Sequence, residues 1–261
     1  MLKVWFFVVM FSLGAVFSSP AQDEAKTAHI SPERLFSRGN DYYENGEYTK
    51  AIDEYKKIFD EGYETGPAYY NIANAYFKSG KLGKAILNYK RAKRIMPRDV
   101  DLMANYKFAR AAIKGKVIAK KGIWSWRPFR LYSQNFTVNE LTGIACGVYI
   151  LIIAAGFVFV MRPTRNRYWL KATGVLLFVF ILFNVTVIWR KASGMKKGAV
   201  VVASRAEALF GPYDTATKFF TLYEGMNATV LKTKGDWYKI RRADGKVGWV
   251  RTNEVERIYN A

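Results

Sequence analysis

The chain holds few of the side chains that covalent or metal chemistry requires. Its 261 residues include one histidine, His29, and one cysteine, Cys146, which lies in an apolar run. A Cys–His hydrolase or a Cys/His zinc site needs several such groups close together. Carboxylates that are neighbours on a predicted helix, such as Asp53 and Glu54, point away from each other. The sequence therefore predicts no catalytic residue, no metal site and no cofactor, and we do not expect an enzyme.

Side chains suited to binding occur in a repeated pattern instead. The segment KAIDEYKKI at residues 50–58 returns as KAILNYKRA at 84–92, displaced by 34 positions. A fixed interval of this length indicates an array of helix pairs. Glycine in NGEY and SGKL can take the left-handed conformation that ends the first helix of each pair. The same interval relates further positions: Gly39 and Ala73, Tyr42 and Tyr76, Gly46 and Gly80, Ala51 and Ala85, Tyr55 and Tyr89.

These positions resemble the tetratricopeptide repeat over residues 32–99. A further helix is predicted in VDLMANYKFARAAI, and we expect it to cap the stack because a terminal repeat must cover the apolar face of its neighbour. The predicted repeat domain therefore spans residues 31–113. The resemblance implies capture of a peptide or protein on the inner helix faces, and packing between helices is the alternative for the same side chains. The candidates are Phe36, Asn40, Tyr43, Tyr70, Asn71, Asn74 and Phe77.

The pattern changes after Gly198 to short apolar or alternating runs, which predict a small all-β barrel at residues 198–261. In ADGK, Asp-Gly stands where a tight two-residue hairpin needs positive backbone angles. The order GDWYKIRRADGKVGWVRTNEV resembles a bacterial SH3 module over roughly residues 199–258. That resemblance implies binding of partner proteins or of cell-wall material such as peptidoglycan.

One strand of this module carries the candidate binding residues. Strand alternation places Trp237 on the same side as Lys239 and Arg241. An indole beside two solvated cations suits a binding platform, whereas a half-buried tryptophan that completes a small core is the alternative. With the preceding acidic residue, the candidate set of the SH3-like module is Asp236, Trp237, Lys239 and Arg241.

Three apolar segments predict export and a membrane anchor. Residues 1–21 have a basic start, an apolar stretch and small residues at the end, which is typical of a secretory signal peptide, with an uncleaved anchor as the alternative. Residues 141–161 contain no charge and reach about 30 Å as a helix, the thickness of a bilayer core. Residues 172–189 are shorter but are flanked by interfacial aromatic residues, so we expect a second transmembrane helix there.

The order of these segments predicts the topology. The short loop at residues 162–171 contains three arginines, as expected for a cytoplasmic loop. Because the N-terminal segment is exported, two crossings return the chain to the outside. We therefore expect both soluble domains in the periplasm and the hairpin in the bacterial inner membrane.

The net charge of +20 is concentrated near the predicted membrane segments. Thirteen of these twenty charges lie within residues 114–197. Basic residues in such places contact anionic lipid headgroups, so the charge predicts a bilayer rather than nucleic acid as the partner. Residues 114–140 form a basic juxtamembrane linker that is consistent either with a strip on the bilayer surface or with an irregular connection.

The sequence thus predicts a multidomain membrane protein with an all-α tetratricopeptide repeat array, a two-helix transmembrane hairpin and a small all-β SH3-like barrel. This order is similar to BatE-type proteins that are encoded with bacterial aerotolerance operons. The resemblance implies a periplasm-facing scaffold that acts in stress tolerance. It also implies that the partners are other membrane proteins of the same complex, some bearing von Willebrand A domains.

Overall fold

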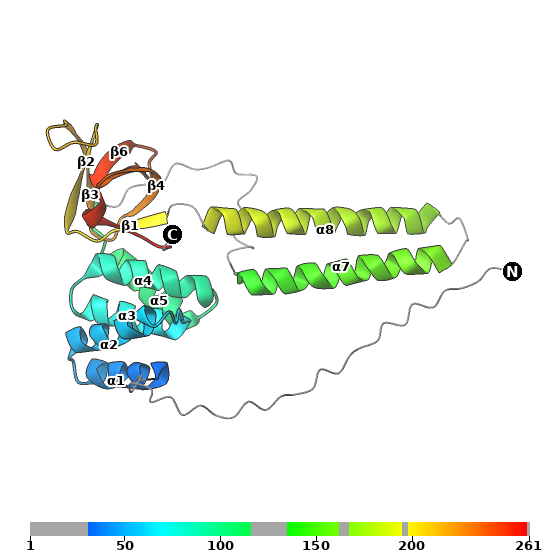
Figure 1. Ribbon diagram of the computed structural model, residues 1–261, viewed down its shortest axis with the longest axis horizontal. Helices are drawn as coiled ribbons and strands as arrows, with labels where there is room; N and C mark the ends of the chain where they lie inside the picture. Colours follow the sequence, from blue (N-terminus) through cyan, green and yellow to red (C-terminus); the bar gives the residue numbers. More distant parts are fainter. Residues whose placement is uncertain (1–30, 116–134, 162–166, 195–197, 260–261) are drawn as a thin grey trace, which may run out of the picture. The chain divides into compact units, whose positions relative to one another are not determined.

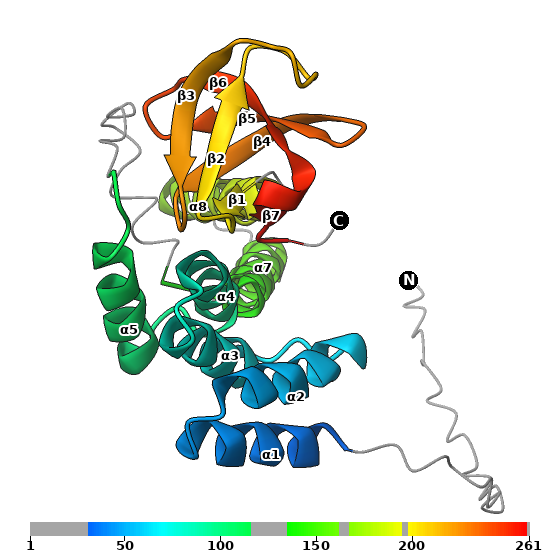
Figure 2. The same cartoon turned by 90° about the vertical axis from the view of Figure 1, so that its left-hand side faces the viewer.

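The structure is a computed structural model that describes residues 31–115, 135–161, 167–194 and 198–259. The predicted signal peptide and most of the basic linker lie outside the described residues. Within the first range, five helices follow one another (Figures 1 and 2). They are α1 (Pro32–Glu44), α2 (Tyr48–Asp60), α3 (Gly66–Lys78), α4 (Leu82–Ile95) and α5 (Val100–Ala111).

The helix boundaries repeat the sequence period. The first helices begin at Pro32, Gly66 and Val100, 34 residues apart. Gly46 and Gly80 end α1 and α3 with φ angles of 77° and 75°, which confirms their predicted left-handed conformation. At the starts of the later helices, the side chains of Thr65 and Asp99 cap α3 and α5 by accepting hydrogen bonds from backbone amides.

The repeat core is built from large side chains set against small ones. Tyr55 and Tyr89 are buried, and a Cβ atom placed on Gly39 would lie 2.5 Å from the ring of Tyr55. The absence of a side chain at Gly39 therefore lets α1 and α2 pack closely, as the pattern predicts. The last helix, α5, buries Leu102 in the same core and leaves Phe108 exposed.

The C-terminal module is a seven-stranded antiparallel sheet in the order β3-β2-β6-β5-β4-β1-β7. Its core includes Val201, Leu222, Val230, Ile240 and Val250. The strands are β1 (Gly198–Val201), β2 (Arg205–Leu209), β3 (Lys218–Tyr223), β4 (Asn227–Lys234), β5 (Trp237–Arg242), β6 (Val247–Arg251) and β7 (Val255–Arg257), with a short 3-10 helix η2 (Thr252–Glu254) before β7.

The β5–β6 connection differs from the predicted two-residue hairpin. The amide of Arg242 donates to the carbonyl of Lys246 at 2.9 Å, so three residues lie between the closing pair. Gly245, the glycine of this loop, has a positive φ of 93°. The Asp244 carboxylate bonds both the Arg242 guanidinium and the Lys246 amide, and these bonds fix the longer loop.

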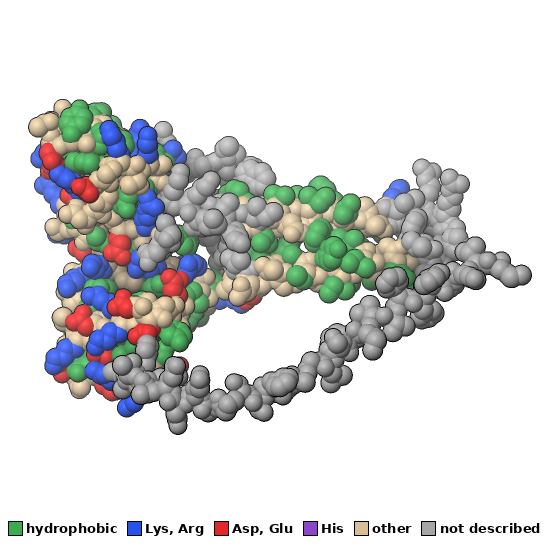
Figure 3. All heavy atoms as spheres, in the orientation of Figure 1, with side chains coloured by type: hydrophobic (Ala, Val, Ile, Leu, Met, Phe, Trp, Pro, Cys, Tyr) green, Lys and Arg blue, Asp and Glu red, His purple; other side chains and the backbone are tan. Residues whose placement is uncertain are grey.

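Two long helices, α7 (Val138–Met161) and α8 (Arg167–Gly194), lie side by side, and the rings of Tyr149 and Phe180 meet with centroids 5.8 Å apart. Hydrophobic side chains cover much of the surface of this pair in Figure 3. By length and composition, Asn139–Phe157 in α7 could cross a membrane, whereas the apolar part of α8, Lys171–Val187, is shorter. Among the described residues, one helix therefore has the length and composition of a membrane span, and the second span stays a prediction.

Two polar residues and a glycine pair of the described helices do not join α7 to α8. Asn184 and Thr186 each donate to the carbonyl four residues earlier in α8, at 2.9 Å and 2.7 Å. Gly143 and Gly147, whose spacing is compatible with close helix approach, have open space where a Cβ would lie. The contact between α7 and α8 therefore does not use this glycine pair.

Candidate functional site

A ladder of asparagine and tyrosine side chains crosses the inner helices of the repeat array. The Tyr55 hydroxyl and the Asn71 amide donate to Asn40 Oδ1 at 2.7 Å and 2.8 Å. One repeat later, the Tyr89 hydroxyl and the Asn105 amide donate to Asn74 Oδ1 at 2.6 Å and 3.3 Å. We call these six residues the asparagine ladder: Asn40, Tyr55, Asn71, Asn74, Tyr89 and Asn105.

The two ladder tyrosines are buried, and burial keeps their hydroxyls protonated as hydrogen-bond donors. Burial raises the pKa of Tyr55 to about 12, chiefly because the phenolate would lose its hydration. The pKa of Tyr89 is raised for the same reason. Both hydroxyls therefore stay protonated at neutral pH and donate to the asparagine oxygens. Each donor bond satisfies a buried polar group that would otherwise be costly.

A small pocket opens beside the ladder. It has a volume of about 240 Å³ and is lined by Asn40, Tyr43, Glu44, Asn71 and Asn74. Within the described chain, the hydrogen bonds of Asn40 and Asn74 use their oxygens, so both side-chain amide groups can still donate to a ligand. The pocket thus offers two donors beside the Glu44 carboxylate, a combination that fits the backbone of an extended peptide.

Of the aromatic candidates, Tyr43 lines this pocket, and all four pack against neighbouring side chains. Tyr43 is half-buried and meets Tyr48 edge-on with ring centroids 5.4 Å apart. Phe77 meets the exposed Phe108 in the same way at 5.7 Å. Phe36 lies 5.9 Å from Tyr55, and Tyr70 accepts a hydrogen bond from Asn105 at 2.7 Å.

All seven repeat candidates lie on α1 and α3, and four of them line the pocket. That the seven form one binding face, which we call the concave face, stays a prediction. Its asparagines are shared between the ladder and the pocket. The concave face consists of Phe36, Asn40, Tyr43, Tyr70, Asn71, Asn74 and Phe77.

The tryptophan of the SH3-like module is covered. Trp237 is 9% exposed and packs with Leu209, Ala216 and Trp249 in a small cluster separate from the main core. The guanidinium of Arg251 lies over its ring, 4.6 Å from the centroid, and pairs with Asp214. This packing corresponds to the core alternative for Trp237.

The other three SH3 candidates lie near Trp237 in different surroundings. The Lys239 ammonium lies 5.8 Å from the centre of the Trp249 ring. Arg241 and Asp236 are exposed, and the backbone carbonyl of Asp236 accepts from Thr252 at 2.9 Å. The indole of Trp237 is therefore covered, and charged side chains that could contact a ligand lie around it.

An exposed aromatic group on the β2–β3 side of this module was not among the predicted sites. The rings of Phe210 and Phe219 lie with centroids 4.3 Å apart and planes tilted by 30°, and Phe210 and Tyr213 are 61% and 58% exposed. The signal in the sequence is the run LFGPY at residues 209–213, in which large apolar residues occupy a turn instead of a strand. Such a patch on a soluble domain is typical of a ligand surface.

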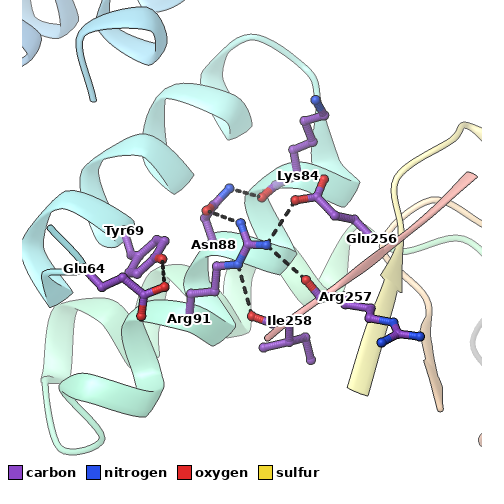
Figure 4. Close-up of polar contacts among 8 residues, drawn as sticks. All are labelled: Glu64, Tyr69, Lys84, Asn88, Arg91, Glu256, Arg257 and Ile258. Atoms are coloured by element: carbon purple, nitrogen blue, oxygen red, sulfur yellow. Dashed lines mark hydrogen bonds and ion pairs between the residues drawn. The ribbon is translucent and has the colours of Figure 1, made fainter. Parts of the chain in front are cut away.

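A second feature that the sequence did not reveal is the contact between the repeat array and the SH3-like module (Figure 4). Arg91 of α4 is largely buried and donates to the carbonyls of Arg257 and Ile258 at 3.0 Å and 3.2 Å. It also pairs with the Glu256 carboxylate at 3.1 Å and donates to Asn88. One guanidinium thus ties β7 to α4.

Close backbone contact supports the same interface. A Cβ on Gly83 would lie 2.4 Å from the carbonyl oxygen of Val201, so only glycine lets β1 approach α4 at this point. The Gly83 amide donates to Glu224 at 2.7 Å, and Val200 of β1 is part of the repeat core. The two modules therefore share buried apolar contacts as well as polar ones.

The family comparisons agree with this domain content. Residues 66–99 match the tetratricopeptide repeat, and residues 211–256 match the bacterial SH3 domain. The chain combines a repeat of the first kind with a module of the second. Each match covers less than half of the chain, and comparison with curated proteins gives no match. Both are binding modules that are typically non-catalytic. The described residues contain no group of three or more His, Cys, Asp or Glu side chains that could hold a metal ion.

Proposed function

We propose that the protein is a membrane-anchored scaffold that faces the bacterial periplasm and binds protein partners through its concave face and its SH3-like module. The observation that carries this proposal is the pocket on the concave face. There, Asn40 and Asn74 use their oxygens to fix the helices and keep their amide groups available as donors. A rigid surface with oriented donors binds an extended peptide with little loss of entropy.

Site-specific photocrosslinking in cells would test this role. A photoreactive phenylalanine analogue at Tyr43 or Phe77 is expected to capture partner proteins, which mass spectrometry would identify. The matched control is the same analogue at Lys56, an exposed position of α2 outside the concave face. Equal yields from the three positions, or no adduct from Tyr43 and Phe77, would argue against peptide capture on this face.

The membrane part of the proposal is a hairpin made by α7 and α8. In its support, Asn139–Phe157 has the length and composition of a membrane span, and almost none of its residues is buried within the protein. The exposed apolar side chains of α8, such as Phe178 and Leu182, suit lipid contact as well. Protease added to spheroplasts should digest both the repeat array and the SH3-like module. Protection of either one would refute the two-span topology.

The identity of the partners follows from the likeness to BatE-type proteins. We propose that they are membrane proteins of an aerotolerance or other stress complex, including members with von Willebrand A domains. Affinity purification from detergent-solubilised membranes should recover such proteins with the full-length chain. Loss of this recovery in an Asn40→Leu/Asn74→Leu variant that remains folded would assign the contact to the concave face.

A second candidate function is that of a peptidoglycan sensor or tether. It is favoured by the exposed aromatic group Phe210, Tyr213 and Phe219, because aromatic surfaces stack well on sugar rings. The full-length chain in detergent should then sediment with purified cell wall, and Phe210→Ala/Tyr213→Ala should abolish retention. Retention that is unchanged in this variant but lost in Trp237→Ala would place the contact at the tryptophan instead.

A further inference from the structure

A basic groove lies between the repeat array and the SH3-like module, away from the residues assigned above. Its volume is about 950 Å³, which exceeds the needs of a small ion and suits several residues of a peptide. Lys93, Lys107 and Arg110 line it from α4 and α5. Met226 and Arg242 line it from the opposite module, so neither module forms the groove alone.

No carboxylate of the described residues neutralises the cations on the helical side of the groove. Among the described residues, no ion pair involves Lys93, Lys107 or Arg110. Burial lowers the pKa of Lys90, and the nearby positive charges of Arg110 and Lys93 lower it further. Arg242, in contrast, is held at 2.7 Å by Asp244. The positive field in the groove therefore comes from the helices, and it is available to an anionic ligand.

Apolar and aromatic surface accompanies these charges. Arg110 lies over the ring of Tyr106, 5.6 Å from its centroid, and Met103 and Ile113 contribute apolar lining. Methionine side chains adapt to varied apolar partners. A ligand that matches this lining carries carboxylates and apolar side chains on one chain, as an acidic peptide does.

The interface holds the groove open before any ligand binds. A Cβ on Gly225 would lie 3.1 Å from Ile113 and 3.4 Å from Ile86, so the β3–β4 turn approaches the helices closely at this glycine, whose φ is 79°. On the other side of α4, the bonds of Arg91 to β7 fix the same two modules. Because the walls are already positioned, a ligand does not need to order them.

We propose that this groove binds an acidic, partly apolar peptide segment of a partner protein. The concave shape favours an inserted chain over a flat bilayer, since a lipid surface contacts protruding basic and aromatic residues most readily. Carboxylates of the peptide would pair with Lys93, Lys107 and Arg110, and its apolar residues would contact Met103 and Met226. This site is separate from the concave face and does not depend on the function proposed for that face.

Fluorescence anisotropy with the full-length chain in zwitterionic detergent would test the proposal. The probe is a short fluorescein-labelled peptide of alternating glutamate and leucine, and the control peptide replaces each glutamate by glutamine. We expect Lys107→Gln/Arg110→Gln to weaken binding of the acidic peptide at least about tenfold. Both side chains are exposed, so this variant should fold normally. Lys107→Glu, which reverses a single exposed charge, provides an independent second variant.

The matched control is Lys78→Gln/Lys234→Gln, which removes two exposed cations that form no ion pair among the described residues and should leave affinity within about twofold. Equal losses in the two double variants would overturn the proposal, because they would show that total charge decides binding. Equal affinity for the glutamine peptide would also overturn it. A third outcome would overturn it as well: the protein does not bind the peptide but binds phosphatidylglycerol vesicles in a way that depends on Lys107 and Arg110. The occupant of the groove would then be a membrane.

Discussion

The concave face and the basic groove use polar side chains in opposite ways. On the concave face, the oxygens of Asn40 and Asn74 each accept two hydrogen bonds within the protein. In the groove, Lys93, Lys107 and Arg110 have no such partners within the described chain. The first arrangement stabilises the fold and leaves donors at its edge, whereas the second accumulates charge that only a ligand can offset.

The two regions also differ in origin. The asparagine ladder is a product of the repeat, because the contact of Asn40 with Tyr55 recurs 34 residues later between Asn74 and Tyr89. The groove occurs once and depends on the SH3-like module docking against α4 and α5. Mutations in the ladder should therefore change stability, and mutations at the docking interface should change the groove.

The largest expected effect is the loss of the repeat array in alkali. Burial raises the pKa of Tyr55, Tyr69 and Tyr76 to about 12. A raised phenol pKa means that the protonated form is favoured in the folded state, so the stabilisation is complete below pH 10 and disappears as pH rises from about 10 to 12. Circular dichroism should show helix loss in that window, coincident with phenolate absorbance. Ionisation of these residues near pH 10 with intact helices would contradict this assignment.

A Gly83→Val substitution should separate the two modules. A Cβ at this position meets the Val201 carbonyl at 2.4 Å and the Cα of Val202 at 2.8 Å, and neither backbone atom can turn aside. We expect a cost of about 3 kcal/mol and at least about a tenfold loss of acidic-peptide binding. Hydrogen exchange of β1 and thermal denaturation would measure the change.

The control for this effect is Lys56→Val, which introduces the same β-branched residue at an exposed helix position and should leave peptide binding unchanged. Photocrosslinking from Tyr43 should persist in Gly83→Val, because the concave face lies entirely on α1 and α3. Loss of both activities together would show that the two surfaces depend on each other.

An Asn74→Ala substitution should weaken the ladder by about 2 kcal/mol. It leaves the buried Tyr89 hydroxyl without its acceptor and removes one of the two acceptors of Asn105. Urea denaturation would measure the loss. Asn105→Ala, at the exposed end of the ladder, should cost less than about 1 kcal/mol. A larger cost at Asn105 than at Asn74 would refute the view that the buried tyrosine bond dominates.

The smallest expected effect concerns pH and the groove. Burial, together with Arg110 and Lys93, lowers the pKa of Lys90 to about 8. The lysine therefore loses its charge as pH rises past 8, and affinity for the acidic peptide should fall about threefold between pH 7 and 9. Lys90→Met should abolish this pH dependence. A pH dependence that survives in the variant would assign it to another group.

The periodic features of the molecule could be predicted from the sequence. The helix starts 34 residues apart, the left-handed Gly46 and Gly80 and the close approach at Gly39 each depend on local pattern. Four of the seven predicted residues of the concave face line the same pocket, and a shared binding surface for all seven stays a prediction. Local pattern did not reveal that the asparagines bond one another, because that depends on the distance between successive inner helices.

Features that join distant segments could not be predicted in this way. Arg91 and Glu256 are 165 residues apart, and each alone has the sequence context of an ordinary surface charge. The closed position of Trp237 likewise depends on Arg251 and Asp214, which follow from sheet register and a loop rather than from strand alternation. The three-residue loop at Gly245 arises because one carboxylate, Asp244, bonds both sides of it.

The docking of β1 and β7 on α4 has a further consequence for chain topology. The repeat array precedes α7 and α8 in the sequence, the SH3-like module follows them, and the two modules pack against each other. The stretch with α7 and α8 is therefore an insertion in one folded unit and does not link two independent domains. Excision of residues 116–197 with a short flexible splice should therefore yield a water-soluble protein in which α4 still carries the sheet.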